Sequence, residues 1–285
     1  MISLTTTAHV VQQMRKAQRA IEFSAYILRS GQIVQALQNA VKHGAHVRVQ
    51  LEAHPYADSD GKLAKINRDA VSKLRRAGVH AQLADVSGQR GMHMKAAIVD
   101  GMAFLDDRNW PADRRNIVIA DDDRGDVHAL REALHGKATP GGALALTKGR
   151  ALAQETAALL DAKQTRDRVS VETESLTAGT APYAAMKALA RSGRCVRLLI
   201  CSDDLRPAAI YAARALLRAG VDVRLTHAAE KIAVAESRAW VGSANATYGQ
   251  AQQTDWGLCL HSRRICKQLQ VRFDSTWQHA NALIA

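Results

Sequence analysis

The chain has 285 residues, of which 47% are hydrophobic and only 4% aromatic, so it is long enough to build one large domain or two lobes around an aliphatic core. Its formal net charge of +12 indicates an anionic partner, such as nucleic acid, an anionic membrane surface or a phosphorylated substrate, although a basic surface that only aids solubility gives the same charge. The four cysteines lack zinc-site spacing, the N-terminus lacks a signal-peptide pattern and no apolar run is long enough for a bilayer, so we expect a cytoplasmic protein without an integral membrane segment.

Helix-like and strand-like patterns alternate through the first half of the sequence. In chain order, the predicted elements are a polar helix (8–19), a strand (20–28), a helix (32–43), a strand (46–51), a loop (55–61), a helix (63–76) and a strand (79–83). A hairpin, a short strand (116–119) and an acidic turn (121–126) follow. This alternation predicts a layered α/β fold.

The best candidate for a boundary is residues 135–142, which include three glycines and a proline. A helix-prone segment follows, and at 169–175 a new strand pattern begins. We therefore predict an N-terminal lobe over 1–142, a linker helix over 143–168 and a C-terminal lobe over 169–285.

The predicted hairpin carries a histidine, a lysine and an asparagine at its base. His93 and Lys95 are two residues apart, so they share a face if the backbone is extended. Asp100-Gly101 stands between two apolar runs, which is a hairpin-turn signal, and the return strand would bring Asn109 back beside them. An imidazole, an ammonium and a carboxamide that converge suit attack on a phosphate. Taken alone, an exposed edge hairpin with scattered polar residues explains the segment about equally well.

An internal repeat separates these two interpretations. The string GAHVRV at 44–49 resembles GRCVRL at 193–198, and RAGV occurs at both 76–79 and 218–221. The separations from lysine to acid and from lysine to asparagine are the same in both halves (Lys95, Asp100 and Asn109; Lys231, Glu236 and Asn245). We therefore predict two similar lobes.

Two such lobes would complete a site for one phosphodiester. A pseudo-two-fold axis would bring both motifs into one cleft, where two lysines and two asparagines would hold the non-bridging oxygens. One histidine would attack phosphorus and form a phosphohistidine, and the other would serve as general acid and base. The lysines supply the positive charge, so this scheme needs neither a metal nor a cofactor.

The motifs resemble those of a known family. His93-x-Lys95-x(4)-Asp100 resembles the HKD motif of the phospholipase D superfamily. The second half is similar to another copy with an intact GSxN tail (Lys231, Glu236, Ser243 and Asn245). The stretch that begins at Asp255 is similar to the acidic strand of the family, and the resemblance covers about 20–277.

This resemblance implies a fold, a reaction and a set of roles. The implied fold is α/β, with two phospholipase D-like lobes that are each a mixed sheet flanked by helices and are related by a pseudo-two-fold axis. The implied reaction is metal-independent phosphodiester cleavage or transfer between the lobes, with His93 as nucleophile and His227 as general acid and base. The other implied residues bind the phosphate (Lys95, Asn109, Lys231, Ser243 and Asn245) or support the site from behind (Asp100, Glu236 and Asp255).

Three departures from the family pattern affect these expectations. His227 lies four residues before Lys231 rather than two, so the two side chains share a phosphate only if the backbone between them turns or bulges; otherwise His227 merely ends a strand. Glu236 replaces the aspartate of the motif. In the first half, Asp106-Asp107 stand where the tail would have Gly-Ser, and two acids disfavour a bound phosphate unless they pair with a cation or face away.

The leading hypothesis is a phosphodiesterase that acts on nucleic acid, because the motifs are paired, the chain is basic and no aromatic-rich membrane-binding loop is visible. The first alternative is a phospholipase D-type hydrolase or transferase that acts on a phospholipid head group. The second is a catalytically impaired protein that binds phosphodiesters. The oligomeric state is left open, since a monomer with two lobes already contains both motifs.

Overall fold

The computed structural model describes residues 1–56, 58–84, 91–113, 116–137, 143–161, 168–203, 205–235, 238–249 and 251–283. The chain divides into two compact units. Unit 1 contains residues 1–146 and 252–256, and unit 2 contains residues 147–251 and 257–285. The short segment 252–256 therefore belongs to the first unit although most of its sequence neighbours belong to the second.

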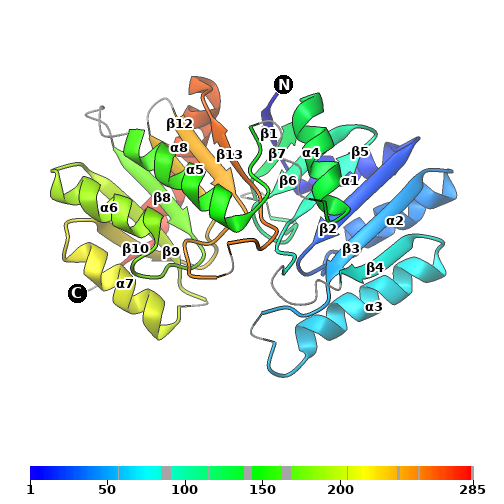
Figure 1. Ribbon diagram of the computed structural model, residues 1–285, viewed down its shortest axis with the longest axis horizontal. Coiled ribbons are helices and arrows are strands. Elements are labelled where there is room, and N and C mark those ends of the chain that lie inside the picture. Colours follow the sequence, from blue (N-terminus) through cyan, green and yellow to red (C-terminus); the bar gives the residue numbers. More distant parts are fainter. Residues whose placement is uncertain are drawn as a thin grey trace. The chain divides into compact units, whose positions relative to one another are not determined.

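Unit 1 is built on a seven-stranded mixed sheet in the order β1-β7-β6-β5-β2-β3-β4 (Figure 1). The strands β2, β3 and β4 are parallel, and the remaining neighbours pair antiparallel. The strand bounds are β1 (Ser3–Thr5), β2 (Ala20–Ala25), β3 (His46–Glu52), β4 (His80–Ala84), β5 (Ala96–Val99), β6 (Met102–Asp106) and β7 (Val118–Asp121).

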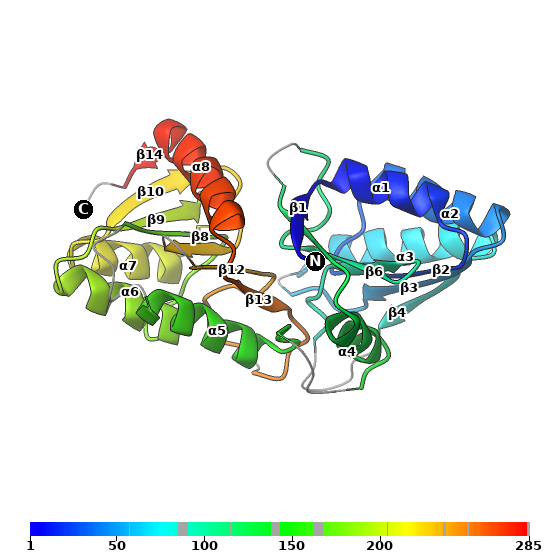
Figure 2. The same cartoon turned by 90° about the horizontal axis from the view of Figure 1, so that it is seen from above.

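Helices cover both faces of this sheet. The helices α1 (Thr7–Lys16), α2 (Gly31–Lys42) and α3 (Lys62–Arg76) lie on one face, and α4 (Arg124–Leu134) lies on the other (Figure 2). The apolar positions of α2 recur at the spacing of one helical face (Ile33, Val34, Leu37 and Ala40), and all of them are buried. Burial of this face against the sheet is what fixes the helix in place.

Unit 2 repeats this architecture. Its seven-stranded sheet has the order β13-β12-β11-β8-β9-β10-β14, with β8, β9 and β10 parallel. The strand bounds are β8 (Val169–Thr173), β9 (Val196–Cys201), β10 (Asp222–Thr226), β11 (Ile232–Ala235), β12 (Arg238–Gly242), β13 (Gly257–Leu260) and β14 (Asn281–Ala282). The helices α5 (Lys148–Asp161), α6 (Ala181–Arg191) and α7 (Pro207–Leu217) lie on one face, and α8 (Arg263–His279) lies on the other (Figure 2).

Six strands of each sheet correspond in order and direction. The series β7-β6-β5-β2-β3-β4 matches β13-β12-β11-β8-β9-β10, and only the end strands β1 and β14 differ. The predicted α/β fold and its repeat are thus confirmed. The repeated glycines have a structural reason, because Gly44 (φ 91°) and Gly193 (φ 81°) end equivalent helices in the left-handed region, which favours glycine.

Some elements differ from the sequence-based expectations. The acidic turn predicted at 121–126 is the N-terminal end of α4, where Asp123 caps the helix by accepting hydrogen bonds from the N–H groups of Gly125 and Asp126. The predicted linker helix is α5, which is part of unit 2, and residues 138–142 of the predicted boundary lie outside the described residues. Within the described ranges, no helix is long and apolar enough to cross a membrane.

Candidate active site

The hairpin at the base of the first motif forms as predicted. β5 and β6 pair antiparallel, with Ala96 opposite Leu105. The turn is Asp100-Gly101, and both residues have positive φ (49° and 97°), which an aspartate tolerates and a glycine favours. His93 and Lys95 lie immediately before β5 rather than within it, so a less regular segment carries them.

His93 is held by the segment 252–256 of unit 1. The N–H of His93 donates to the carbonyl of Thr254 at 2.8 Å, and the N–H of Thr254 donates to the carbonyl of Gly91 at 3.0 Å. Nδ1 of His93 lies 2.8 Å from Oδ1 of Asp255, a carboxylate that is 1% exposed. Because a carboxylate only accepts hydrogen bonds, Nδ1 carries a proton in this contact, and in the neutral imidazole the lone pair is then on Nε2. A neutral imidazole with its lone pair on Nε2 is chemically able to act as a nucleophile.

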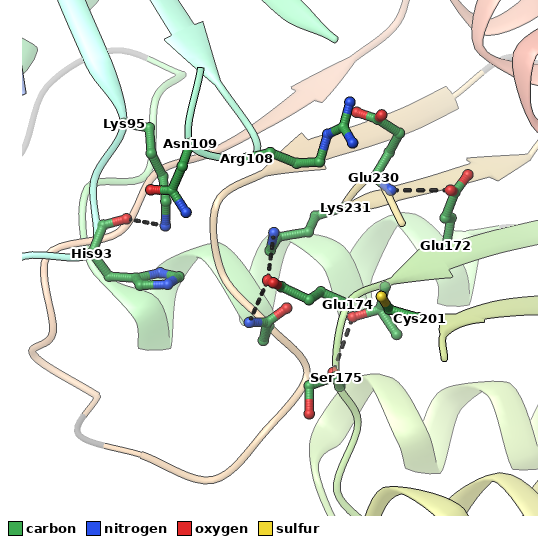
Figure 3. Close-up of polar contacts among 12 residues, drawn as sticks. His93, Lys95, Arg108, Asn109, Glu172, Glu174, Ser175, Cys201, Glu230 and Lys231 are labelled. Carbon is green, nitrogen blue, oxygen red and sulfur yellow. Dashed lines mark hydrogen bonds and ion pairs between the residues drawn. The ribbon is translucent and has the colours of Figure 1, made fainter. Parts of the chain in front are cut away.

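Lys95 and Asn109 gather around the end of β2. Lys95 is 1% exposed, its Nζ donates to the carbonyl of His93 at 2.6 Å, and the same atom lies 5.3 Å from the ring centroid of Tyr26 (Figure 3). The Tyr26 ring also packs edge-on against His93, with 4.8 Å between centroids. The next residue, Ile27, donates its N–H to Oδ1 of Asn109 at 3.2 Å. Imidazole, ammonium and carboxamide thus meet at the carboxyl end of one strand.

The two acids of the first tail are fully buried. Oδ2 of Asp106 accepts from the N–H of Trp110 at 2.6 Å, and Oδ1 accepts from the side-chain amide of Asn116. Burial, together with the negative charge of Asp107, raises the pKa of Asp106 to about 7 despite these donors. At neutral pH the pair therefore carries less than two full negative charges, which eases the conflict with a phosphate.

Asp100 lies at the opposite end of β5 from Lys95. Its two carboxylate oxygens accept the N–H groups of Gln18, Arg19 and Ala20, each at 2.9 Å. Burial alone would raise the pKa of Asp100, but these donors and the charge of Arg19 outweigh it and hold the pKa below its usual value. Asp100 thus anchors the start of β2 and supports the site only through that strand.

The second motif builds a related set of contacts within unit 2. Lys231, which is 2% exposed, forms an ion pair through Nζ with Oε2 of Glu174 at 3.0 Å (Figure 3). The side-chain amide of Asn245 donates to the same oxygen at 3.3 Å. Ser243 is fully buried, and Glu236 lies outside the described residues. One carboxylate therefore engages two of the three residues that the sequence assigns to phosphate binding in this half, Lys231 and Asn245.

His227 has a different environment from His93. Its side chain is 85% exposed, and Nδ1 lies 3.1 Å from Oδ1 of Asp203 and 3.4 Å from Oγ of Ser202. It stands directly after β10, on the side of the sheet away from β11 and β12, since β8 and β9 come between them in the strand order. Its position is that of a surface residue at a strand end, which was the alternative in the sequence analysis.

Tyr26 and Glu174 belong to none of the motifs from which the site was predicted. Both lie just beyond the carboxyl end of a parallel strand, β2 or β8. Ligand sites in α/β sheets form at that edge, so a search of strand ends for polar and aromatic residues would have found them.

A family model described as "Cardiolipin synthase, PLD-like domain" matches residues 10–124 and 159–277. The chain belongs to the phospholipase D superfamily. No curated protein gives a match to this sequence.

Solved structures share the two-lobed fold of this phospholipase D-like chain. Polyphosphate kinase from Porphyromonas gingivalis superposes with a TM-score of 0.70 at 13% identity over 98% of this chain, which spans 47% of the kinase. Phosphatidylserine synthase from Haemophilus influenzae Rd KW20 superposes with a TM-score of 0.67 at 10% identity, covering 99% of this chain and 87% of the synthase. At these identities the likeness concerns the fold.

Proposed function

We propose that this chain cleaves or transfers a phosphodiester through a phosphohistidine on His93. The observation that carries the proposal is the hydrogen bond between Nδ1 of His93 and Asp255, which directs the proton to Nδ1 and makes Nε2 the nitrogen that would attack. The charge on Asp255 also stabilises the imidazole as it becomes positive during attack. Superfamily membership supports the same general chemistry, which is phosphodiester processing.

In the proposed mechanism, both half-sites act on a single phosphodiester. Lys95 and Lys231 offset the charge on the non-bridging oxygens, and Asn109 and Asn245 donate hydrogen bonds to them. The repeated motif and the matching strand orders of the two sheets support this pairing. Because the two ammonium groups supply the positive charge, the mechanism requires no metal ion.

Nucleic acid is the proposed substrate class. The net charge of +12 supports it, as does the exposed surface of α3, where six lysines and arginines accompany one aspartate within 15 residues. A phospholipid head group is the second candidate, supported by the description of the matching family model and by the shared fold of phosphatidylserine synthase. In that case the phosphoryl group passes to an alcohol rather than to water.

The test measures release of nitrophenol from bis(p-nitrophenyl) phosphate, cleavage of single- and double-stranded DNA, and turnover of phospholipid vesicles with and without glycerol, all in EDTA. We expect activity in the wild type and its loss in His93→Ala. His43→Ala is the matched control, because His43 is an exposed histidine that caps α2. Alkaline quenching followed by mass measurement of the intact protein should trap the phosphoryl group on wild type but not on His93→Ala.

Each outcome of this test bears on a separate part of the proposal. A folded wild type that is inactive on every diester would leave a phosphodiester-binding protein as the remaining function. Activity lost in EDTA and restored by a divalent metal would overturn the metal-independent mechanism. Turnover of vesicles without cleavage of DNA would make the phospholipid head group the substrate.

A further inference from the structure

The second half-site lacks a histidine beside its lysine. Lys95 precedes Ala96, which pairs with Ser24 of β2, and Lys231 precedes Ile232, which pairs with Glu172 of β8. Counted back from each lysine, the position that His93 occupies in unit 1 belongs to Ala229 in unit 2. Ala229 is buried and carries no group that can transfer a proton.

Glu174 occupies the place of Tyr26 in the same comparison. Tyr26 lies two residues after Ser24 and Glu174 lies two residues after Glu172, so the two registers make Tyr26 and Glu174 equivalent. In unit 1 the ring at this position packs against His93. In unit 2 the position instead carries an ionisable group.

The carboxylate of Glu174 contacts two of the residues assigned to phosphate binding in its half-site, Lys231 and Asn245. Oε2 lies 3.0 Å from Nζ of Lys231 and 3.3 Å from the amide nitrogen of Asn245 (Figure 3). Its side chain is 42% exposed, so solvent and a ligand can reach it. A phosphate held by the same two donors would lie against this carboxyl group.

We propose that Glu174 is the general acid and base of the second half-site and takes the role of the absent histidine. This inference rests on the proposed function, because it requires that both half-sites hold one phosphodiester. It assigns the proton transfer to a residue that the family motif does not mark.

The proposed steps balance as follows. Nε2 of His93 forms a bond to phosphorus while the bond from phosphorus to the leaving oxygen breaks, and protonated Glu174 gives its proton to that oxygen, which leaves as an alcohol. Water or an acceptor alcohol then gives a proton to the Glu174 carboxylate as its oxygen bonds to phosphorus. The phosphorus–nitrogen bond breaks, and its electron pair returns to Nε2 of His93.

Substrate binding itself prepares Glu174 for the first step. In the unliganded chain, Oε2 of Glu174 forms an ion pair with Nζ of Lys231. The non-bridging oxygens of a bound diester compete for Lys231 and Asn245, and their negative charge favours a protonated carboxyl beside them. The proton is therefore available when the diester is in place.

The test compares two diesters that differ in their need for an acid. Diphenyl phosphate has a poor leaving group, and bis(p-nitrophenyl) phosphate has a good one. We expect Glu174→Gln to lower kcat by about 100- to 10,000-fold for diphenyl phosphate and by less than about 10-fold for the nitrophenyl ester. It should also remove one limb of the pH–rate profile. Asp222→Asn, at an exposed carboxylate at the start of β10 in the same unit, is the matched control and should leave both rates unchanged.

A rescue variant tests whether the second half-site needs a group that transfers a proton. Glu174→Tyr combined with Ala229→His copies the Tyr26 and His93 arrangement into the second half-site. We expect this double variant to recover activity on diphenyl phosphate relative to Glu174→Gln, with circular dichroism and a melting curve as checks of folding.

Several results would overturn the inference while the proposed function stands. One is an equal loss of kcat on both diesters in Glu174→Gln, while the wild type is active. Another is a Glu174→Gln variant that is faster than wild type, which would mean that the carboxylate only competes with the phosphate for Lys231. A third is a loss of kcat in His227→Ala, rather than in Glu174→Gln, that is larger for diphenyl phosphate than for the nitrophenyl ester. That result would make His227 the residue that donates the proton. A folded wild type without activity on either diester would contradict the proposed function itself.

Discussion

In the proposed mechanism, Asp255 fixes the proton on Nδ1 of His93, so that Nε2 is the attacking nitrogen. It lies 2.8 Å from Nδ1 and is 1% exposed, so it accepts a hydrogen bond in a site that is largely shielded from water. Asp255→Asn keeps the size of the side chain but removes the charge that stabilises a positive imidazole. We expect kcat to fall roughly 100- to 10,000-fold with little change in KM. Steady-state kinetics on bis(p-nitrophenyl) phosphate measure this, with the exposed Asp69→Asn as control.

A loss confined to KM would contradict this role for Asp255. It would mean that Asp255 only shapes the binding surface. The trapped phosphoenzyme gives an independent readout, because slower attack by Nε2 lowers the rate at which the adduct appears.

Glu155 makes the stability of unit 2 depend on pH. It is 2% exposed on α5, and within the described residues its Oε2 accepts no hydrogen bond. Burial raises the pKa of Glu155 to about 8. Between the unfolded pKa of about 4.3 and the folded value, the folded chain binds the proton that the unfolded chain loses, so the stability falls as pH rises through this range.

Glu155→Gln should remove this part of the pH dependence. The amide stays neutral at every pH, so the variant does not lose stability in this way. Its free energy of unfolding, relative to that of wild type, should increase between about pH 4 and pH 8 by an amount on the order of a few kcal/mol. Urea unfolding at a series of pH values measures the difference. Parallel profiles for the two proteins would show that the Glu155 carboxyl is already ionised in the folded state.

At the scale of the elements, the sequence predicts what is set locally. The turn at Asp100-Gly101 follows from residues that tolerate positive φ, and the helices follow from their apolar faces. The family resemblance placed Asp255 at the site, but its specific contact with His93 was not predictable, because no periodic pattern relates residues that lie 162 positions apart. The start of α4 was missed for another reason, since Asp123 is equally typical of a turn and of a helix cap.

The hairpin between β5 and β6 is fixed to β2 by the carboxylate of Asp100. Asp100→Ala removes an acceptor for three backbone N–H groups and leaves an alanine at positive φ. We expect a loss of about 1–3 kcal/mol in the free energy of unfolding of unit 1. Asp100→Asn, which keeps one acceptor oxygen and tolerates positive φ, should lose less. Denaturant unfolding of both variants at pH 7 measures this order.

The effect of Asp100 should also depend on pH. Because the folded pKa of Asp100 is below its usual value, the stabilisation is present above the unfolded pKa and is lost as pH falls through the folded pKa. The difference in stability between wild type and Asp100→Ala should therefore shrink as pH falls through the folded pKa of Asp100. A constant difference down to pH 2 would assign the effect to the backbone of the turn.

For the whole molecule, the repeat was the property that the sequence showed most clearly. Equal spacings in two halves predicted two matching sheets, and six strands of each unit correspond. The chemical difference between the halves was only partly visible. The irregular position of His227 was noticed, whereas the carboxylate beside Lys231 lies 57 residues earlier in the sequence and required the structure.

The net charge of +12 predicts how binding responds to salt. If nucleic acid is the partner, lysines and arginines displace condensed counterions, and the logarithm of the binding constant falls by about 0.7 per phosphate contacted on a single strand for each tenfold increase in salt. We expect the Kd of a fluorescent single-stranded oligonucleotide for His93→Ala, which binds without cleaving, to rise steeply between 50 and 200 mM salt. Replacing Lys65, Arg68 and Lys73 of α3 with glutamine should reduce that slope. Replacing Arg263, Arg264 and Lys267 of α8 with glutamine removes the same charge from another helix and is the matched control.

The same measurement with vesicles separates the two substrate classes. A phospholipid enzyme that recognises the head group keeps its affinity for neutral phosphatidylcholine vesicles at high salt, because no net charge is neutralised. A nucleic-acid enzyme binds those vesicles weakly at any salt, and its affinity for the oligonucleotide depends on the α3 charges. An oligonucleotide Kd that is independent of salt, together with retained binding to neutral vesicles, would contradict the nucleic-acid assignment.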